Sequence, residues 1–467
     1  MGKMKTSEIS TKPKVGLITT MSPDSTWPDE WVVDVGEMHK QAKACLAEIG
    51  MEVLECGEIA RTNKEMTAQG NQVRQMGAEV LIIYTGTWTY SSTAVSAALA
   101  ADVPTIVWAD ATPGRFGIVG GSITRGALDE MGIKTTLVYG TGLDDQKLLA
   151  ELKMRLTGIA AATRLRGLTY GVGGARCMGM YTAVIDGNEG RKKFGIEVDG
   201  FEQVEILKRA KEMPDEEALQ FLSWMKKEFG KIVPTEEVMI AQIKMYLALK
   251  NIIKEKGYDF IAVKCLPELP SCYTTFCIAH AMLNDKSDAY GQKESFVCAC
   301  EADSNGALTM QILKHLSGGP ALFADVLHLN MTNGLACLCN CGSQPTDFAT
   351  SRKEVHWESE GLREFTWKIG GACPQYVAKP GKMTLARIGR IDGEYVMLIT
   401  TGEAQEFPRE KLKEINWYHP QAFVKLDCDP DSFIKCLRSN HIHAVYGDFK
   451  EHLLQVCDIL DIKPIVP

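Results

Sequence analysis

The chain has 467 residues, of which 45% are hydrophobic and 24% are charged, and its formal net charge is −8. This length allows roughly two to four domains, and the acidic balance argues against nucleic acid as the main partner, because phosphate backbones bind basic surfaces. No run approaches the roughly 18 apolar residues that a membrane-spanning helix needs.

The first third of the chain alternates apolar, strand-like runs with helical segments. The strand-like runs are 14–20, 79–85, 103–110 and 134–140, and helical spacing covers 34–50. Continuous apolar strands separated by helices are typical of a parallel sheet covered on both faces. Ligands of such sheets bind beyond the carboxyl ends of the strands. In this part of the chain those ends carry Thr19, Thr20, Thr87, Trp88 and Asp110.

The same alternation begins again at residue 166. A strand and a glycine loop occupy 166–174, and long helical stretches cover 214–256 before Gly257. Further strands are expected at 258–265, within 294–300 and at 321–330. We interpret this region as a second α/β domain, with 321–330 as another of its strands.

The last part of the chain has a different pattern. Residues 383–404 contain two strand-like runs joined by Asp392-Gly393, which is a strong hairpin signal. A closing helix is expected near 447–460. The predicted fold is therefore α/β, with two doubly wound parallel-sheet (Rossmann-like) domains over 1–165 and 166–345. A smaller, mostly antiparallel β-rich domain over 346–467 follows them.

The chain contains 15 cysteines. Its charged, polar start does not resemble a signal peptide, so we expect a cytoplasmic protein with reduced thiols. Cys337, Cys339 and Cys341 alternate in sequence. Structural zinc sites usually contain C-x₂₋₄-C pairs, so the alternation favours thiols packed on a strand over a zinc site.

Glu301 and Asp325 are the most informative pair of carboxylates. Glu301 ends the strand-like run ESFVCAC, and Asp325 lies late in the apolar run ALFAD, 24 residues further along the chain. One strand–helix–strand unit takes about that many residues, so we expect both groups at the ends of neighbouring parallel strands. A carboxylate inside an apolar run must be paired or metal-bound, because an isolated buried charge is costly.

A purely structural role for these carboxylates is the alternative, since acidic residues also cap helices. Asp303, Ser304 and Asn305 are suitable caps for the helix expected near Gly306. With those caps available, Glu301 is not needed for that purpose. Spacing alone leaves the two interpretations balanced.

Two histidines follow in the segment SNHIHAVYGD, residues 439–448. His441 and His443 alternate, so both can face the same side of a strand. A single histidine is more often a core or surface group than a ligand. The paired spacing makes these two candidates for nitrogen ligands.

Nucleotide-binding patterns are weak or missing. The glycine cluster at 171–180 follows a strand, but it does not have the G-x-G-x-x-G spacing of a dinucleotide site. The sequence contains no G-x-x-x-x-G-K-[ST] loop and no G-x-S-x-G elbow. An ATPase is therefore not expected.

The chain resembles the L-fucose isomerase family and its arabinose isomerase relatives. The resemblance is most specific in CEADSNGALTMQIL (300–313), FADVLHLN (323–330) and NHIHAVYGD (440–448). It implies that Glu301 and Asp325 are catalytic residues and that both bind a metal together with His441. It also implies Mn²⁺, or another divalent ion such as Mg²⁺ or Co²⁺. A closed homo-oligomer, usually a hexamer, is implied as well, with a neighbour's first domain covering the site.

The chemistry implied by the resemblance is interconversion of an aldose and a ketose through a cis-enediolate intermediate. A cation bound to the carbonyl and the adjacent hydroxyl stabilises the charge that develops when a proton leaves carbon. Two carboxylates and one imidazole suit Mn²⁺ or Mg²⁺ better than a closed zinc site. We expect the two carboxylates also to transfer the protons.

Several other residues are candidates for substrate binding. Trp88 can stack on a sugar face or be a partly buried aromatic, and Arg176 and Lys264 can meet hydroxyls or an anionic group or be ordinary solvated charges. Asn440 and His443 complete the set. Three alternatives remain beside a free-sugar isomerase: an isomerase of a sulfonated or phosphorylated hexose, a non-catalytic sugar-binding protein, and a metal-dependent aldolase that would use a similar metal and enediolate.

Overall fold

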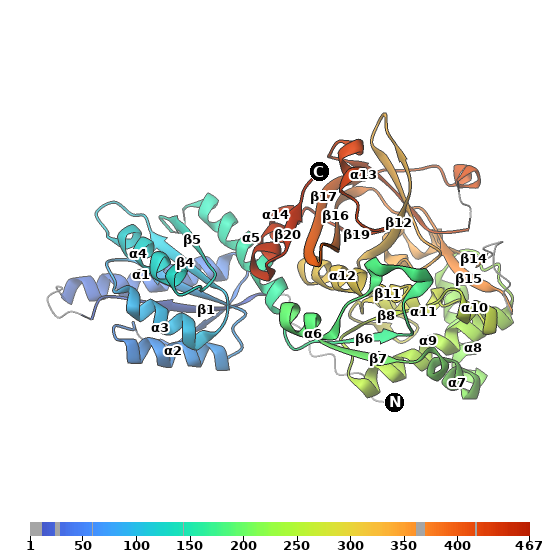
Figure 1. Ribbon diagram of the computed structural model, residues 1–467, viewed down its shortest axis with the longest axis horizontal. Coiled ribbons are helices and arrows are strands. Elements are labelled where there is room, and N and C mark those ends of the chain that lie inside the picture. Colours follow the sequence, from blue (N-terminus) through green and yellow to red (C-terminus); the bar gives the residue numbers. More distant parts are fainter. Residues whose placement is uncertain (1–11, 24–28, 58, 143, 361–368, 416–417) are drawn as a thin grey trace. The chain divides into compact units, whose positions relative to one another are not determined.

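The computed structural model describes residues 12–23, 29–57, 59–142, 144–360, 369–415 and 418–467. The described chain forms two compact units. The first runs to Arg164 and includes Glu451–Ile459, and the second comprises Leu165–Lys450 and Leu460–Pro467. Both contain a parallel sheet, and the second also contains a mostly antiparallel sheet built from C-terminal strands, so the predicted α/β fold class is confirmed (Figure 1).

The first unit is built on a five-stranded parallel sheet of order β2-β1-β3-β4-β5. Its strands are β1 (Lys14–Thr19), β2 (Glu52–Glu55), β3 (Val80–Thr85), β4 (Thr105–Asp110) and β5 (Thr135–Gly140). Four of these match predicted strands. β2 was not predicted, because its four half-buried residues provide little apolar signal. The helices are α1 (Asp29–Glu48), α2 (Asn63–Gln75), α3 (Ser91–Ala101), α4 (Gly117–Glu130), α5 (Gln146–Thr163) and α14 (Lys450–Leu460), the predicted closing helix.

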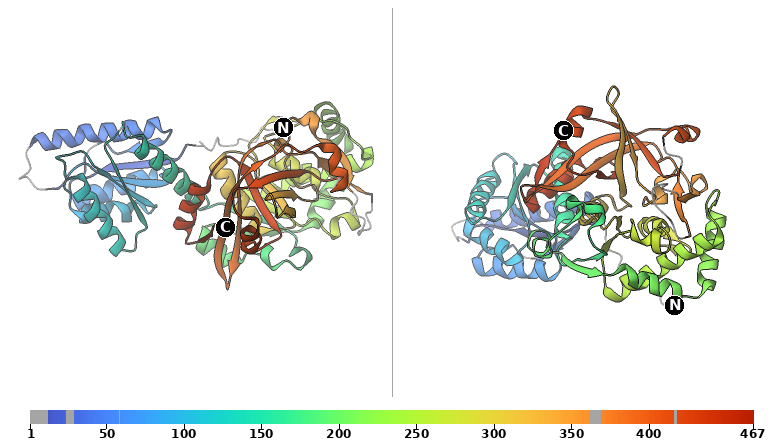
Figure 2. Two further views of the ribbon diagram at one scale, coloured as in Figure 1. Left: turned by 90° about the horizontal axis from the view of Figure 1, so that it is seen from above. Right: turned by 45° about the vertical axis from the view of Figure 1, so that its right-hand side comes forward.

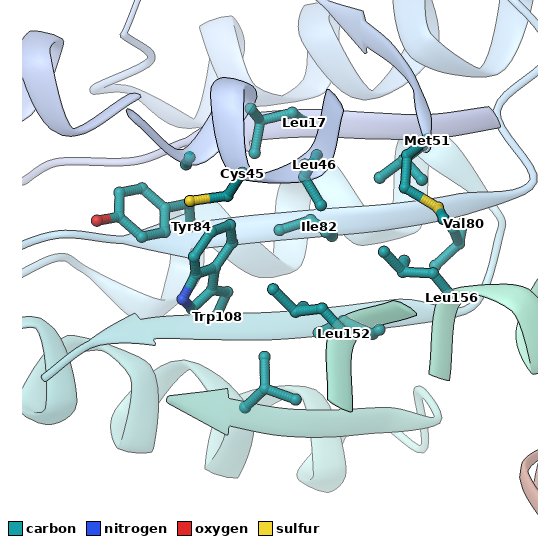
Figure 3. Close-up of a cluster of buried hydrophobic side chains, with 14 of the residues drawn as sticks. Leu17, Cys45, Leu46, Met51, Val80, Ile82, Tyr84, Trp108, Leu152 and Leu156 are labelled. Atoms are coloured by element: carbon teal, nitrogen blue, oxygen red, sulfur yellow. The ribbon is translucent and has the colours of Figure 1, made fainter. Parts of the chain in front are cut away.

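A large apolar cluster covers one face of this sheet (Figure 3). Leu17, Ile82 and Trp108 point from adjacent strands toward Leu46 of α1 and Leu152 of α5, and each is at most 1% exposed. Burial of such side chains contributes about 1.5–3 kcal/mol each. The alternating apolar strands and helices of the sequence therefore form the predicted parallel sheet, and helices cover this apolar face.

The second unit begins with a four-stranded parallel sheet of order β11-β8-β6-β7. Its strands are β6 (Thr169–Gly173), β7 (Glu197–Phe201), β8 (Phe260–Val263) and β11 (Cys298–Cys300). Its longest helix, α9 (Glu236–Lys256), begins at the Thr235 cap and ends at Gly257, which has a φ of 68°. The other helices are α6 (Gly187–Glu189), α7 (Gln203–Glu212), α8 (Asp215–Glu228), α10 (Glu268–Cys272) and α11 (Cys277–Asn284). In the part of the chain that the structure describes, no helix is long and apolar enough to cross a membrane.

A seven-stranded sheet of order β16-β19-β12-β13-β18-β17-β20 forms the rest of this unit. Because β16 also pairs with β17, six of these strands form a closed cycle of pairings. Figure 2 shows the C-terminal strands of this unit, coloured from orange to red, from two further directions. The predicted hairpin is confirmed, with Asp392 and Gly393 at φ values of 51° and 84°. The strands are β12 (Leu322–Asn330), β13 (Leu335–Cys339), β16 (Gly381–Ile391), β17 (Glu394–Ala404), β18 (Gln421–Leu426), β19 (His441–Tyr446) and β20 (Lys463–Ile465). Two small ribbons, β9 (Ser287–Asp288) with β10 (Gly291–Gln292) and β14 (His356–Glu360) with β15 (Gly371–Gln375), and helix α13 (Pro430–Cys436) complete the unit.

The sequence-based placement of β12 was wrong. It was predicted as a parallel strand of the second α/β domain, but it pairs antiparallel with both β13 and β19. The physical reason lies in residues 331–334, which separate β12 from β13. Four residues can close a hairpin, whereas a parallel crossover needs a dozen or more. The predicted domain boundary at 345 stays a prediction.

Helix α12 (Ser304–Ser317) connects the two sheets of the second unit. It packs against β8 and β11 of the parallel sheet and against β16 and β19 of the other (Figure 1). Asp303 caps its N-terminus by accepting a hydrogen bond from the Gly306 amide, and Gly318 ends it at a φ of 64°. The first turn of α12 therefore lies where β11 meets β12 and β19, and this place holds the candidate site.

Candidate metal centre

Strand register brings the first two predicted ligands together. Asp325 on β12 lies directly opposite His441 on β19 in the antiparallel ladder. Directly opposite residues project to the same face with their Cβ atoms about 4.5–5.5 Å apart. His441 Nε2 is 3.8 Å from Asp325 Oδ1. Two segments more than 100 residues apart in sequence thus bring these side chains to one point.

Glu301 reaches the same point from the other sheet. It follows β11 directly, and both Glu301 and Ala302 have left-handed backbones, with φ values of 60° and 50°. Residues other than glycine pay about 1–2 kcal/mol for this conformation. Such strain collects at functional sites, where the surrounding structure enforces it. Here it directs the Glu301 carboxylate to 3.4 Å from His441 Nε2.

These three side chains form a set suited to a divalent cation. One ligand atom each from Glu301, Asp325 and His441 lies within 4.8 Å of the other two. Glu301 Oε2 and His441 Nε2 are buried and have no hydrogen-bond partner. Buried polar atoms are almost always satisfied, so two unsatisfied atoms facing each other need an explanation. A shared cation satisfies both, and the residues present therefore fit a metal.

A buried carboxylate and guanidinium support His441 from behind. His441 Nδ1 hydrogen-bonds Asp303 Oδ2 at 2.7 Å. Arg387 of β16 holds the same carboxylate through both of its terminal nitrogens, at 2.5 and 3.1 Å. Metal-binding histidines usually donate their second N–H to such a carboxylate, which fixes the ring and its tautomer. The ring is thereby oriented with Nε2 toward Glu301 and Asp325.

The charges in this cluster shift its pKa values in consistent directions. Burial opposes ionisation of Asp303, but the Arg387 guanidinium and the His441 hydrogen bond outweigh it and hold the pKa of Asp303 well below its usual range. Burial alone would lower the pKa of His441, yet the attraction of Asp303 and Glu301 raises it to about 10. Burial, with the nearby charge of Glu301, raises the pKa of Asp325. The cluster therefore attracts positive charge to the position that His441 Nε2 faces.

A cavity of about 450 Å³ opens beside Asp325. Two amides orient this carboxylate: Asn440 Nδ2 donates to Oδ1 at 2.8 Å, and Asn340 Nδ2 donates to Oδ2 at 3.0 Å. The Asp325 side chain is 33% exposed, whereas those of Glu301 and His441 are 6% and 1% exposed. The site is thus closed on the protein side and open toward the cavity. The lining residues are Asp325, Val326, Leu327, Cys339, Asn340, Cys341, His419, Leu437, Ser439 and Asn440.

The other predicted site residues are not all brought to this cavity. Asn440 lines it. His443 is fully buried, its Nε2 accepts a hydrogen bond from Arg387 at 3.1 Å, and its role in substrate binding stays a prediction. Lys264 is buried and bonds Glu268 at 2.6 Å. Arg176 is exposed over the Tyr181 ring, with 4.4 Å between them. Trp88 lies half-buried in the first unit, and its role in substrate binding stays a prediction.

Sequence reasoning missed three residues of the centre. Asp303 was expected only to cap α12, and it does so while also holding His441. Asn340 was not considered. Arg387 was also missed, although an arginine in the apolar run MTLARIGRI is a usable signal, because a fully buried arginine requires a buried partner.

Comparison with known proteins agrees with this architecture. Residues 12–163 match the first N-terminal domain of L-fucose isomerase, and residues 338–466 match its C-terminal domain. The sulfoquinovose isomerase of Alkalicoccus urumqiensis is 25% identical over 375 residues, which cover 78% of this chain and 80% of that protein. That of Clostridium sp. (strain MSTE9) is 25% identical over 58% of each chain. The L-fucose isomerase of Salmonella typhi is 24% identical over 74% of this chain and 73% of that protein.

The chain belongs to the L-fucose isomerase family. It is therefore an isomerase that acts in carbohydrate metabolism, and the alternative of a non-catalytic sugar-binding protein is not supported. A solved solute-binding protein from Agrobacterium vitis, bound with α-D-tagatopyranose, is 15% identical and covers 66% of this chain and 90% of its own. The TM-score of that comparison is 0.17.

Proposed function

We propose that this protein is a metal-dependent aldose–ketose isomerase whose cation is held by Glu301, Asp325 and His441. The observation that carries the proposal is the pair of buried atoms without hydrogen-bond partners, Glu301 Oε2 and His441 Nε2, facing each other 3.4 Å apart. Family membership supports isomerisation of a sugar.

The donor set favours a hard divalent cation. Two carboxylates and one imidazole are suited to Mn²⁺, Mg²⁺ or Co²⁺, and the family resemblance favours Mn²⁺. Asp325 borders the cavity, so a sugar placed there can approach the same point from the open side. When bound, such a cation supplies positive charge that stabilises the negative oxygens of a cis-enediolate as it forms.

The proton transfers fall to the chain's own carboxylates. Isomerisation removes a proton from one carbon, places it on the neighbouring carbon and shifts a second proton between the two oxygens. Asp325 is the group best exposed to the cavity, and its raised pKa brings it closer to the acidity of a useful proton carrier. Glu301 is the second carrier. Asn340 and Asn440 hold the Asp325 carboxylate in position both as a metal ligand and as a proton carrier.

A direct test compares metal content and turnover in matched variants. Glu301→Gln keeps the shape of the side chain and removes its charge. We expect loss of bound Mn²⁺ and a fall in turnover of about 10²-fold or more, a typical size for one acid–base group. Glu358→Gln is the control, since Glu358 is also buried but does not line the cavity. Full Mn²⁺ content together with full turnover in Glu301→Gln overturns the proposal.

An anionic hexose is the second candidate substrate. Four relatives are named sulfoquinovose isomerase, which favours a sulfonated sugar. The described lining of the cavity, however, contains no lysine or arginine. Turnover of neutral, sulfonated and phosphorylated hexoses by the Mn²⁺-loaded protein decides between the classes. Loss of activity on the anionic sugars alone in Arg176→Ala and Lys264→Ala would favour the second candidate, and equal loss on neutral sugars would remove its basis.

A homo-oligomer completes the proposal. The family resemblance implies a hexamer in the cytoplasm, with a neighbour's first domain over the cavity and Trp88 as a stacking surface for the sugar. Light scattering on the purified protein measures the assembly. A monomer with full turnover would contradict a shared site.

A further inference from the structure

The three alternating cysteines of the sequence have different surroundings. Cys337 and Cys339 lie on β13 and pack in an apolar cluster with Leu412 and Phe423, as packing thiols are expected to do. Cys341 lies two residues beyond the end of β13 and lines the cavity beside Asp325. Cys339 borders the same cavity but is only 3% exposed, whereas Cys341 is half-buried, so a solvent-borne ion reaches Cys341 more readily.

Cys341 meets a thiol from a distant segment. Cys300 is the last residue of β11, directly before Glu301. The Sγ atoms of Cys300 and Cys341 and one carboxylate oxygen of Glu301 all lie within 4.8 Å of one another. A tetrahedral ion with sulfur bonds of about 2.3 Å holds its sulfurs roughly 3.8 Å apart. The group is thus close to a ligating arrangement and needs only small side-chain movements to reach it.

We propose that Cys300, Cys341 and Glu301 form a second cation site, selective for a soft divalent ion such as Zn²⁺ or Cd²⁺ and sharing Glu301 with the hard-cation site. The two sites differ in donor chemistry. One has an oxygen-rich shell with a single imidazole, and the other has two sulfurs. Thiolates select soft ions, whereas carboxylates suit Mn²⁺ and Mg²⁺.

Binding at this site exchanges protons for metal. Hydrogen bonding with Cys341, together with burial, raises the pKa of the Cys300 thiol well above its usual value. A dication forms two sulfur–metal bonds and releases the two thiol protons to solvent. The fourth position of a tetrahedral ion is left for water from the cavity.

The shared carboxylate gives the second site a consequence for activity. An ion on the two thiols engages Glu301, which the hard-cation site also requires. Zn²⁺ or Cd²⁺ then inhibits the enzyme through Cys341. This consequence rests on the proposed function, whereas the existence of the soft-ion site does not.

Spectroscopic titration with Cd²⁺ tests the site without any activity measurement. The metal-free full-length protein, reduced with a phosphine, is titrated with Cd²⁺ while the ultraviolet sulfur-to-cadmium charge-transfer band is recorded. We expect one equivalent of Cd²⁺ to produce this band in the wild type and in Asp325→Asn, which lacks only a hard-site ligand. Retention of the band in Asp325→Asn separates this proposal from the proposed function.

Matched cysteine variants identify the thiols. Cys341→Ser, at a half-buried position, and the double variant Cys300→Ser/Cys341→Ser are expected to lose the band. The control double variant Cys272→Ser/Cys436→Ser removes the same number of thiols elsewhere and is expected to keep it. No band in the wild type, or an undiminished band in a folded Cys341→Ser protein, overturns the proposal.

Discussion

Asp325 and His441 are cross-strand partners in adjacent antiparallel strands, and Nε2 of the imidazole lies 3.8 Å from Oδ1 of the carboxylate. This pairing fixes the metal centre by register. A slip of one residue between β12 and β19 would turn one of the two side chains to the opposite face of the sheet. The centre therefore depends on the packing of α12 and β16, which hold β19 in place, as much as on the ligands themselves.

The contact between Asp303 and His441 predicts a specific effect on metal affinity. Asp303→Asn keeps a helix cap of equal quality but removes the carboxylate behind the imidazole. We expect the affinity for Mn²⁺ to fall about 10–100-fold, the usual cost of losing such a partner. Asp429→Asn, at the cap of α13, is the control, since that carboxylate caps a helix and contacts no proposed ligand. Equal affinities in both variants, measured by Mn²⁺ titration, would show that Asp303 acts only as a cap.

Arg387 predicts a large loss of stability. Its side chain is 2% exposed, and its guanidinium bonds the fully buried Asp303. Arg387→Met leaves that carboxylate buried without its cation, a change that typically costs about 3–5 kcal/mol. Arg390→Met, on the same strand, removes a partly exposed arginine paired with Glu189 and should cost less than about 1 kcal/mol. Denaturant unfolding of both variants checks this, and similar losses would contradict the central role of the buried pair.

Gly306 predicts a steric effect on the same cluster. A Cβ at this position would lie 2.6 Å from Asp303 Oδ2 and 2.9 Å from His443 Nε2, and Arg387 holds both of these atoms. Gly306→Ala should therefore weaken Mn²⁺ binding and cost about 1–3 kcal/mol of stability, as overpacking usually does. Gly126→Ala, in a helix where an added Cβ meets nothing within 4 Å, should instead stabilise the protein by about 0.4–1 kcal/mol. Normal Mn²⁺ affinity and normal stability in Gly306→Ala would show that Asp303 and His443 can shift to accommodate the added methyl group at little cost.

His280 predicts how stability depends on pH. It is fully buried in α11, and burial lowers its pKa from 6.5 to about 4. Between these values the unfolded chain binds a proton that the folded chain does not, so stability falls as pH falls from about 6.5 toward 4. The loss from this residue is about 2 kcal/mol at pH 5 relative to pH 7.

Replacing His280 isolates its contribution to the pH dependence of the unfolding free energy. His280→Asn should reduce the difference in unfolding free energy between pH 7 and pH 5 by that amount, whatever its effect at pH 7. His328→Asn, which replaces a histidine at an exposed position, is the matched control variant. An unaltered pH dependence of stability in His280→Asn would show that His280 is not the source of the loss between pH 7 and pH 5.

Local pattern was enough to predict most of the fold. The four apolar runs of the first unit, the Asp392-Gly393 hairpin and the Gly257 helix end all follow from short-range rules, and the structure contains each of them. The placement of β12 was wrong because a buried strand has the same apolar residue pattern in a parallel sheet and in an antiparallel sheet. The short link from β12 to β13 was the available signal, and it was not used.

The candidate site was predictable only in part. Glu301, Asp325 and His441 were proposed from spacing and resemblance, and the structure brings them together although the predicted strand arrangement was wrong. Asp303 and Arg387 interact across 84 residues of sequence, a separation at which no periodic pattern links two side chains. The burial of His443 was not foreseen, because alternation gives the face of a strand but not how deeply a helix such as α12 covers that face.

The most direct test is the position of a bound ion in crystals of the protein soaked with Mn²⁺. The proposed function predicts one anomalous-scattering peak about 2.1 Å from a carboxylate oxygen of Glu301, from a carboxylate oxygen of Asp325 and from His441 Nε2. It also predicts that chelation abolishes turnover and that Mn²⁺ restores it. A peak that lies away from these three residues, or full turnover by protein free of metal, would contradict the account.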